Sequence, residues 1–136
     1  MKKLAILFLL FLSILQTEAQ NKPSPIIFIY DASGSMWGQI EGRPKIEIAL
    51  DVLSDAVNKL PENQKIGLVA YGHRSKGDCK DVETLVDVSN GSKVAVIKSL
   101  KSIKPLGKTP LAYPAQVVID KLKQNSLKAT IILVTD

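Results

Sequence analysis

The stretch from Ile26 to Gly38, IIFIYDASGSMWG, decides the fold that we predict for this chain. It opens with a continuous apolar run, Ile26–Tyr30, that is rich in β-branched and aromatic side chains. Such a run without polar alternation is typical of a strand buried on both faces of a parallel sheet. Asp31 then leads into a turn rich in glycine and serine. The stretch therefore predicts a central parallel strand that carries a carboxylate and several hydroxyl groups at its carboxyl end.

Strands and helices alternate along the rest of the chain. Apolar residues recur every three or four positions after Pro44, which predicts a helix from Pro44 to about Leu60 that Pro61 ends. We predict further strands at 65–71, 82–88 and 129–134, and further helices at 93–103 and up to about 122. The connection between Tyr71 and Val82 is short for a helical crossover, so the third strand is expected to run antiparallel to the second. This order of elements predicts an α/β fold with a doubly wound, Rossmann-like, mostly parallel sheet.

Spacing also predicts two local details of the helices. In the helix at 93–103, Val94, Ile97 and Leu100 are expected to face inward. In the following helix, Pro114 is expected to delay or kink the first turn, because proline lacks the amide hydrogen that a helix interior uses.

Composition narrows the classes of protein to be considered. Hydrophobic residues make up 46% and charged residues 23% of the 136 residues, a mix typical of globular domains rather than of disordered, collagenous or coiled-coil chains. Eighteen basic and 13 acidic residues give a net charge of +5, which is too diffuse to indicate a nucleic-acid partner. A single cysteine, Cys79, and a single histidine, His73, exclude a disulfide-stapled miniprotein and a cysteine-rich zinc module.

The N-terminus has the pattern of a secretory signal peptide. A positively charged head at 1–3 precedes an apolar run at 4–15, and Thr17 and Ala19 are the small residues of a cleavage site. A helix over that run would be about 18 Å long, short of the roughly 30 Å hydrocarbon core of a membrane, although a membrane anchor is the alternative. We therefore expect two parts, a signal peptide at 1–19 and an exported domain at 20–136. The domain would be secreted or periplasmic, with no membrane span after cleavage.

Carboxylates and hydroxyls are predicted to meet at one edge of the sheet. Asp31, Ser33 and Ser35 follow the first strand, and Asp136 follows the last. In open α/β sheets, ligands bind at the carboxyl ends of the strands. If the two strands are neighbours, the two carboxylates end about 4.8 Å apart, and they repel each other unless a proton or cation lies between them. Hydroxyl and carboxylate oxygens suit Mg²⁺ or Mn²⁺ better than zinc or copper.

The motif Asp-x-Ser-Gly-Ser-Met after an apolar strand resembles the metal-ion-dependent adhesion site of von Willebrand factor type A (vWA) domains. The Thr-Pro-Leu segment that begins at Thr109 and the Thr-Asp pair that ends at Asp136 are similar to the later parts of that site. The segment 71–79, YGHRSKGDC, is similar to one found in a secreted bacterial subgroup. The resemblance covers essentially the whole exported part, and it implies the strand order 3-2-1-4 with the third strand antiparallel.

The resemblance also implies a role for each residue of the motif. Ser33 and Ser35 would bind Mg²⁺, or Mn²⁺, directly, and three further residues would bind it directly or through water: Asp31, Thr109 and Asp136. An exposed Asp or Glu of a partner protein would complete the coordination. Two carboxylates neutralise a dication without exceeding its charge, so a third carboxylate is still attracted. The chain would thus be an adhesion-type, protein-binding domain and not an enzyme.

The length of the chain carries a further expectation. The vWA domains that it resembles usually have six strands, and this sequence supplies four before it stops at Asp136. The resemblance therefore implies that the last strands are missing, as in a truncated gene product, and that the strand at 129–134 is an apolar edge that favours aggregation. The subgroup tends to carry a cysteine soon after the final aspartate, so Cys79 is expected to form a disulfide in a longer version.

Two other functions remain beside the metal-bridging one. In a degenerate structural module, Ser33 and Ser35 are only turn residues, and Thr109 caps a helix that begins at Pro110. A metal-assisted hydrolase is the other, although the sequence has no Gly-x-Ser-x-Gly elbow and no histidine beside Ser35.

Three residues are predicted to border the site: Trp37, His73 and Arg74. Trp37 either anchors a partner, as aromatic residues often do, or packs against its own loop. His73 and Arg74 lie in the segment that leaves the second strand at the same edge of the sheet. His73 and Cys79 are too few to make a zinc site by themselves.

Overall fold

The computed structural model describes residues 22–136, so the signal peptide predicted at 1–19 lies outside the described residues. Within this range the main sheet consists of β1 (Ile26–Asp31), β4 (Ile66–Tyr71), β5 (Val82–Val86) and β6 (Thr130–Val134). The helices are α2 (Lys45–Lys59), α3 (Lys93–Ser102) and α4 (Ala112–Gln124). A 3₁₀ turn, η1 (Gly34–Trp37), and a small sheet of β2 (Gln39–Ile40) and β3 (Arg43–Pro44) connect β1 to α2.

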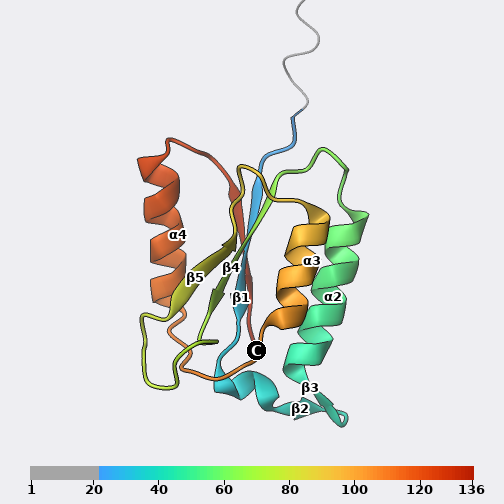
Figure 1. Ribbon diagram of the computed structural model, residues 1–136, viewed down its shortest axis with the longest axis vertical. Helices are drawn as coiled ribbons and strands as arrows, with labels where there is room; N and C mark the ends of the chain where they lie inside the picture. Colours follow the sequence, from blue (N-terminus) through green and yellow to red (C-terminus); the bar gives the residue numbers. More distant parts are fainter. Residues whose placement is uncertain (1–21) are drawn as a thin grey trace, which may run out of the picture.

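The sheet order β5-β4-β1-β6 confirms the predicted order 3-2-1-4. β1 pairs in parallel with β4 on one side and with β6 on the other, whereas β5 runs antiparallel to β4, as the short connection predicts. The register places Asp31 beside Tyr71 and Tyr30 beside Val134. The carboxyl ends of β1 and β6 therefore lie together (Figure 1), which brings Asp31 and Asp136 to the same edge of the sheet.

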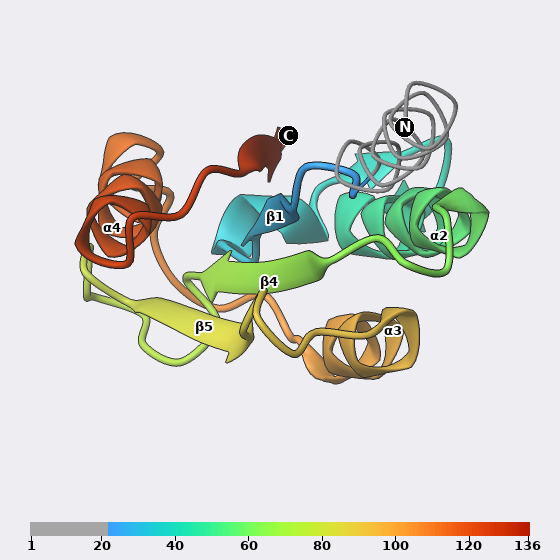
Figure 2. The same ribbon diagram turned by 90° about the horizontal axis from the view of Figure 1, so that it is seen from above.

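Helices cover both faces of the sheet. α2 and α3 pack on one face and α4 packs on the other (Figures 1 and 2). Alternate residues of β1 point to opposite sides: Phe28 and Tyr30 join the core beneath α2 and α3, and Ile27 and Ile29 join the core beneath α4. β1 and β4 are buried almost throughout, as their unbroken apolar runs predict. This arrangement confirms the doubly wound α/β fold class.

The predicted inward face of α3 is wrong at one position. Val94 is 77% exposed and Val96 is buried in its place, whereas Leu100 is buried and Ile97 packs against the core, as predicted. Leu100 belongs to two rows of apolar residues on the helix, one with Val94 and Ile97 and one with Val96. The row with Val96 is the one that continues to buried Ile103. The extra burial at the end of the helix therefore decides its rotation.

The prediction that Pro114 delays or kinks α4 is also wrong. The helix begins at Ala112, and Pro114 lies buried in its first turn. The first four amides of a helix have no partner within it, so a proline in this turn removes no helix hydrogen bond.

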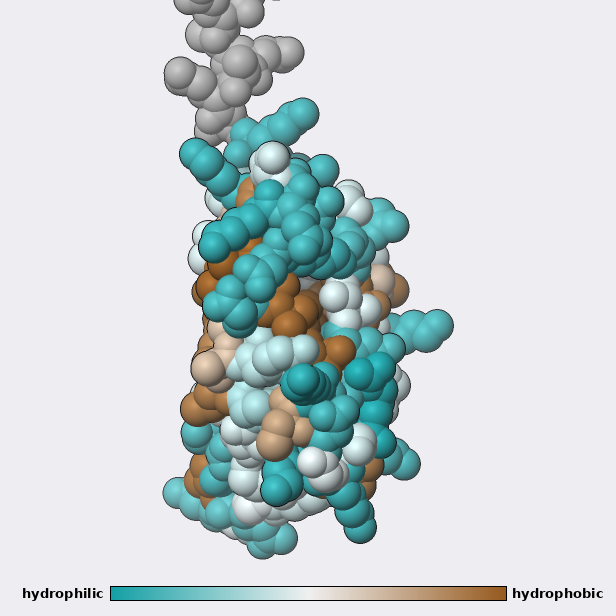
Figure 3. Space-filling view, turned by 90° about the vertical axis from the view of Figure 1, so that its left-hand side faces the viewer, coloured by the Kyte–Doolittle hydropathy of each residue, from teal (hydrophilic) through white to brown (hydrophobic). Residues whose placement is uncertain are grey.

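The α4 side of the sheet is the more open one. Between α4 and the sheet lies a cavity of about 490 Å³, whose walls are mainly apolar side chains of β1, β4, β5 and α4. The ion pair of Lys121 with Asp87, at 2.8 Å, also lines it. Figure 3 views the molecule from this side and shows apolar surface framed by hydrophilic side chains.

β6 is an edge strand in the described part of the chain. It pairs with β1 alone there, and its residues Ile132 and Leu133 are both partly exposed. None of the helices in residues 22–136 has the length and apolar character needed to cross a membrane.

Candidate functional site

Asp31 ends β1 and is completely buried. Its Oδ1 accepts a hydrogen bond of 2.8 Å from the backbone N–H of Ser33, which closes a tight local turn. Its Oδ2 accepts a hydrogen bond of 2.8 Å from the hydroxyl of Thr135, just beyond β6. The carboxylate is thus fixed from both strands, and each of its oxygens keeps a further lone pair.

The two serines of the motif lie side by side above Asp31. The turn η1 folds back on itself, with Met36 buried beneath it, so that the hydroxyl oxygens of Ser33 and Ser35 lie 3.0 Å apart in a hydrogen bond. The Ser35 hydroxyl also donates to Asp136 Oδ1 at 3.2 Å. Four of the five predicted ligands therefore come together in one hydrogen-bonded group: Asp31, Ser33, Ser35 and Asp136.

Asp136 has a second contact that the sequence did not predict. Its Oδ2 lies 2.8 Å from the ammonium nitrogen of Lys45, at the start of α2. The hydrogen bond from Lys45, joined by the one from Ser35, holds the pKa of the Asp136 carboxyl below its usual value. Lys45 and Thr135 are the two polar contacts that sequence reasoning missed. Their positions in the chain could have pointed to them, because Thr135 adjoins the predicted ligand Asp136 and Lys45 is the first residue of the helix that follows the motif.

Thr109 is the predicted ligand that the structure does not join to the others. In residues 22–136, no hydrogen bond connects its hydroxyl to the other four residues, and it is exposed. Its loop is nevertheless attached to the site, because the N–H of Gly34 donates to Gly107 O at 2.9 Å and Ser33 forms an isolated bridge with Gly107. The alternative role of Thr109 as a helix cap is wrong, since Leu111 holds that position.

The four grouped side chains offer hydroxyl and carboxylate oxygens as ligands, and only the two carboxylates are charged. Hydroxyl and carboxylate oxygens of this kind fit a hard cation such as Mg²⁺ or Mn²⁺. Among the described residues, no three His, Cys, Asp or Glu side chains are placed to hold a metal ion together, so any cation at this edge would depend on hydroxyls beside the two carboxylates.

Comparison with known proteins decides the family. Residues 26–136 match the family model of the von Willebrand factor type A domain, which is most of the chain. The chain belongs to the vWA domain family.

Two uncharacterised proteins of Bacillus subtilis (strain 168) are similar to it. YwmC is 28% identical over 105 residues, which are 71% of this chain and 46% of YwmC. YwmD is 28% identical over 94 residues, which are 64% of this chain and 42% of YwmD. The matched part of the chain thus spans less than half of either relative.

Two solved structures show the same fold. The pilus adhesin SpaC from Lactobacillus rhamnosus GG superposes with a TM-score of 0.61 and 20% identity, over 86% of this chain and 16% of SpaC. Proximal thread matrix protein 1 from the mussel byssus gives a TM-score of 0.59 and 17% identity, over 82% of this chain and 28% of that protein. At these identities the likeness establishes the vWA fold alone.

Trp37 lies at the rim of the candidate site of this vWA domain. Its indole N–H donates to Pro105 O at 2.9 Å, which ties η1 to the segment after α3. The side chain is still 51% exposed. The two predictions for Trp37 therefore do not exclude each other, because the polar end packs on a neighbouring loop while much of the ring stays accessible.

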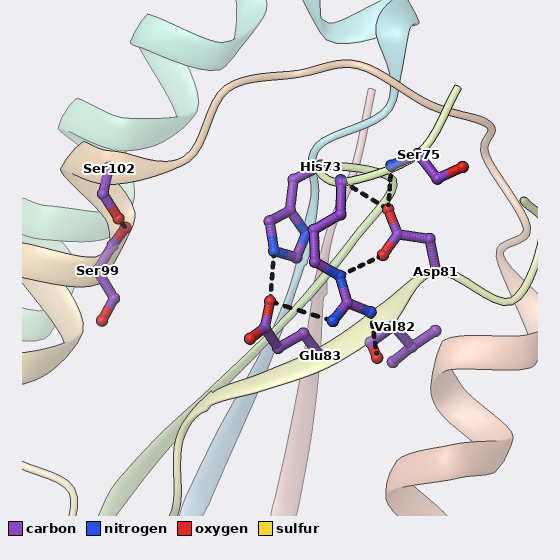
Figure 4. Close-up of polar contacts among 8 residues, drawn as sticks. His73, Ser75, Asp81, Val82, Glu83, Ser99 and Ser102 are labelled. Atoms are coloured by element: carbon purple, nitrogen blue, oxygen red, sulfur yellow. Dashed lines mark hydrogen bonds and ion pairs between the residues drawn. The ribbon is translucent and has the colours of Figure 1, made fainter. Parts of the chain in front are cut away.

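His73 and Arg74 belong to a compact polar cluster in the loop after β4 (Figure 4). His73 Nε2 lies 2.8 Å from Glu83 Oε2, and Arg74 Nε lies 2.7 Å from Asp81 Oδ1. Asp81 Oδ2 accepts from the backbone N–H groups of Arg74 and Ser75 at 2.7 and 3.0 Å. Burial raises the pKa of the Asp81 carboxyl, but these donors outweigh burial and hold it below its usual value. The loop is therefore a fixed border of the sheet edge. Cys79, farther along it, is exposed and unpaired within the described residues.

Proposed function

We propose that this vWA domain binds one divalent cation, Mg²⁺ or Mn²⁺, and recruits a partner protein through an acidic side chain of that partner. The observation that carries the proposal is the hydrogen-bonded group that joins Asp31, Ser33, Ser35 and Asp136 across two neighbouring strands. When bound, the cation supplies positive charge for a carboxylate from outside. The proposed role is binding, with no catalytic step.

Within this proposal the chain's own residues have distinct roles. Ser33 and Ser35 hold the cation with their hydroxyl oxygens, and Asp31 and Asp136 supply its balancing charge. Asp31 is already positioned by the Ser33 amide and the Thr135 hydroxyl, so it needs no rearrangement to serve the cation or a water on it. Thr109 joins from the loop that is attached through Gly107.

We also propose that the domain acts outside the cell, secreted or periplasmic. The pattern at 1–19 supports export. A pilus adhesin and a byssus thread matrix protein share the fold, which supports such a role at the level of the fold. A partner with an exposed Asp or Glu should then co-purify in the presence of Mg²⁺ and be lost when a chelator is added.

Thermal unfolding tests the metal site. A cation that binds only the folded state at about 100 times its Kd stabilises the protein by about 2.7 kcal/mol, which for a domain of this size raises Tm by on the order of 10 °C. Mn²⁺ should therefore raise Tm relative to EDTA in the wild type, and Ser33→Ala should abolish the rise. Ser102→Ala, which removes an exposed hydroxyl on α3 that bonds only Ser99 O, is the matched control and should keep it.

A metal-free structural module is the second candidate. It is favoured by one observation, the Lys45 ammonium on Asp136, because that contact already supplies a positive charge to the acidic group. In that case Mn²⁺ and EDTA give the same Tm, and Ser33→Ala changes only the baseline stability.

A further inference from the structure

Asp136 presents its two carboxylate oxygens to different groups. Oδ1 accepts from the Ser35 hydroxyl at 3.2 Å, on the side of the proposed cation site, and Oδ2 lies 2.8 Å from the Lys45 ammonium. The Asp136 side chain is only 16% exposed and the Lys45 side chain only 30%, so water screens the ion pair incompletely. The Lys45 ammonium thus already binds one carboxylate oxygen of Asp136, a proposed ligand of the metal cation.

The fold holds Lys45 in this place. It is the first residue of α2, and its backbone N–H donates to Gly38 O at 2.8 Å, at the end of the loop that carries Ser35. Its side chain passes close to Gly38, where an added Cβ would lie 3.4 Å from Lys45 Cε and 3.6 Å from Nζ. The ammonium is therefore delivered to Asp136 by the same loop and helix start that build the site.

We propose that Lys45 is a tethered competitor of the divalent cation: it holds Asp136 when the cation is absent and lowers the affinity of the site for it. The inference rests on the proposed metal site. Like charges repel, so an ammonium beside the site opposes the arrival of a dication. The dication must also replace or share a charged hydrogen bond on Asp136, which is stronger than a neutral one.

The competing explanation makes the opposite prediction. If Lys45 only orients Asp136 for the cation, its removal leaves the carboxylate badly placed and weakens cation binding. If it competes, its removal strengthens binding. The sign of the change therefore separates the two roles.

The experiment is a Mn²⁺ titration of the exported chain, 20–136, with free Mn²⁺ followed by electron paramagnetic resonance. Lys45→Met should bind Mn²⁺ about tenfold more tightly than the wild type, which corresponds to about 1.4 kcal/mol. Lys45→Arg keeps the charge and should resemble the wild type. Lys59→Met is the matched control: it removes the same charge from the other end of α2, where Lys59 pairs with exposed Asp55.

Each result bears on the inference. Equal or weaker binding by Lys45→Met overturns it, while the proposed metal site stands if the wild type binds Mn²⁺. If neither protein binds Mn²⁺, both proposals fail. Binding by Lys45→Met alone supports both. Circular dichroism of the variants without metal checks the fold, and Lys45→Gln is the second variant if Lys45→Met is misfolded.

In the wild type, the NMR signal of the Lys45 ammonium should also change when Mg²⁺ is added. An unchanged signal at saturating Mg²⁺ contradicts the inference.

Discussion

Two buried tyrosines on neighbouring strands differ in whether their hydroxyl groups have a partner. Tyr30 donates to Ile46 O at 3.1 Å, which ties β1 to the first turn of α2. The Tyr71 hydroxyl, on β4, is buried without a hydrogen-bond partner among the described residues. Burial raises the pKa of Tyr71 above its usual value, and the adjoining Asp31 carboxylate raises it further, so the group stays neutral.

This contrast predicts opposite effects for the same substitution. Tyr71→Phe removes a buried hydroxyl that makes no hydrogen bond among the described residues, so the free energy of unfolding should stay the same or rise by up to about 1 kcal/mol. Tyr30→Phe removes a hydrogen bond and should cost about 1 kcal/mol. Urea unfolding without metal measures both. A loss of more than about 1 kcal/mol for Tyr71→Phe would show that its hydroxyl has a partner after all.

Asp81 fixes the loop after β4 by accepting three hydrogen bonds while buried. Because its pKa is held below the ordinary 3.8, its stabilisation is present above pH 4 and is lost as the pH falls through the native pKa. Asp81→Asn should therefore cost about 2 kcal/mol at pH 7, since charged hydrogen bonds are lost. The difference from the wild type should shrink as the pH falls below 3.8 and vanish below the native pKa.

Unfolding free energies at several pH values test this prediction. Asp51→Asn is the control, because Asp51 forms only an exposed pair with Arg43, and such pairs contribute about 0–1 kcal/mol. A cost for Asp81→Asn that stays constant between pH 7 and pH 3 would contradict the role given to its charge.

At the scale of elements, the loop between α3 and α4 matters most for the site because it carries Thr109. Besides the Trp37 indole on Pro105 O, backbone contacts hold it: Gly107 N–H donates to Gly72 O at 2.6 Å, and Gly107 O accepts from Gly34 N–H. A Cβ at Gly107 would collide with the Ser75 carbonyl oxygen and crowd Gly72. Glycine is thus required by close approach of three loops.

Gly107→Ala should displace this loop. We expect a loss of about 1–3 kcal/mol of stability, as for other overpacked sites, and a reduced rise of Tm on adding Mn²⁺, because Thr109 moves with the loop. Gly77→Ala is the control, since an added Cβ there meets nothing within 4 Å. If Gly107→Ala kept the full Mn²⁺ effect, the position of this loop would not matter for the cation.

The elements also show where the sequence suffices. The central strands and their carboxyl-end residues were predictable because unbroken apolar runs have few alternatives in a doubly wound sheet. The inward face of α3 was not, because two apolar stripes share Leu100 and only packing against Ile103 selects one. Pro114 was misjudged because its effect depends on its place in the helix, which the sequence alone left open.

At the scale of the whole molecule, sheet order brings distant segments together. β6 returns beside β1, so Asp136 reaches residues about a hundred positions earlier, as its contact with Ser35 shows. This order was predictable from the family resemblance, and it brings four of the five candidate ligands to one edge of the sheet. The Lys45 contact was not, because a long flexible side chain leaves its partner undetermined until the loop and helix are placed.

The central claim is that oxygens from three separate segments meet at one hard dication. The most direct test is NMR of the ¹⁵N-labelled chain 20–136 with substoichiometric Mn²⁺, which broadens amides close to the ion. We predict broadening at 31–36, 107–110 and 135–136, and its reversal by excess Mg²⁺. Amides at 87–89, which follow β5 at the opposite edge of the sheet, should stay sharp. Broadening confined to other acidic segments, or absent from all three predicted ones, would contradict the claim.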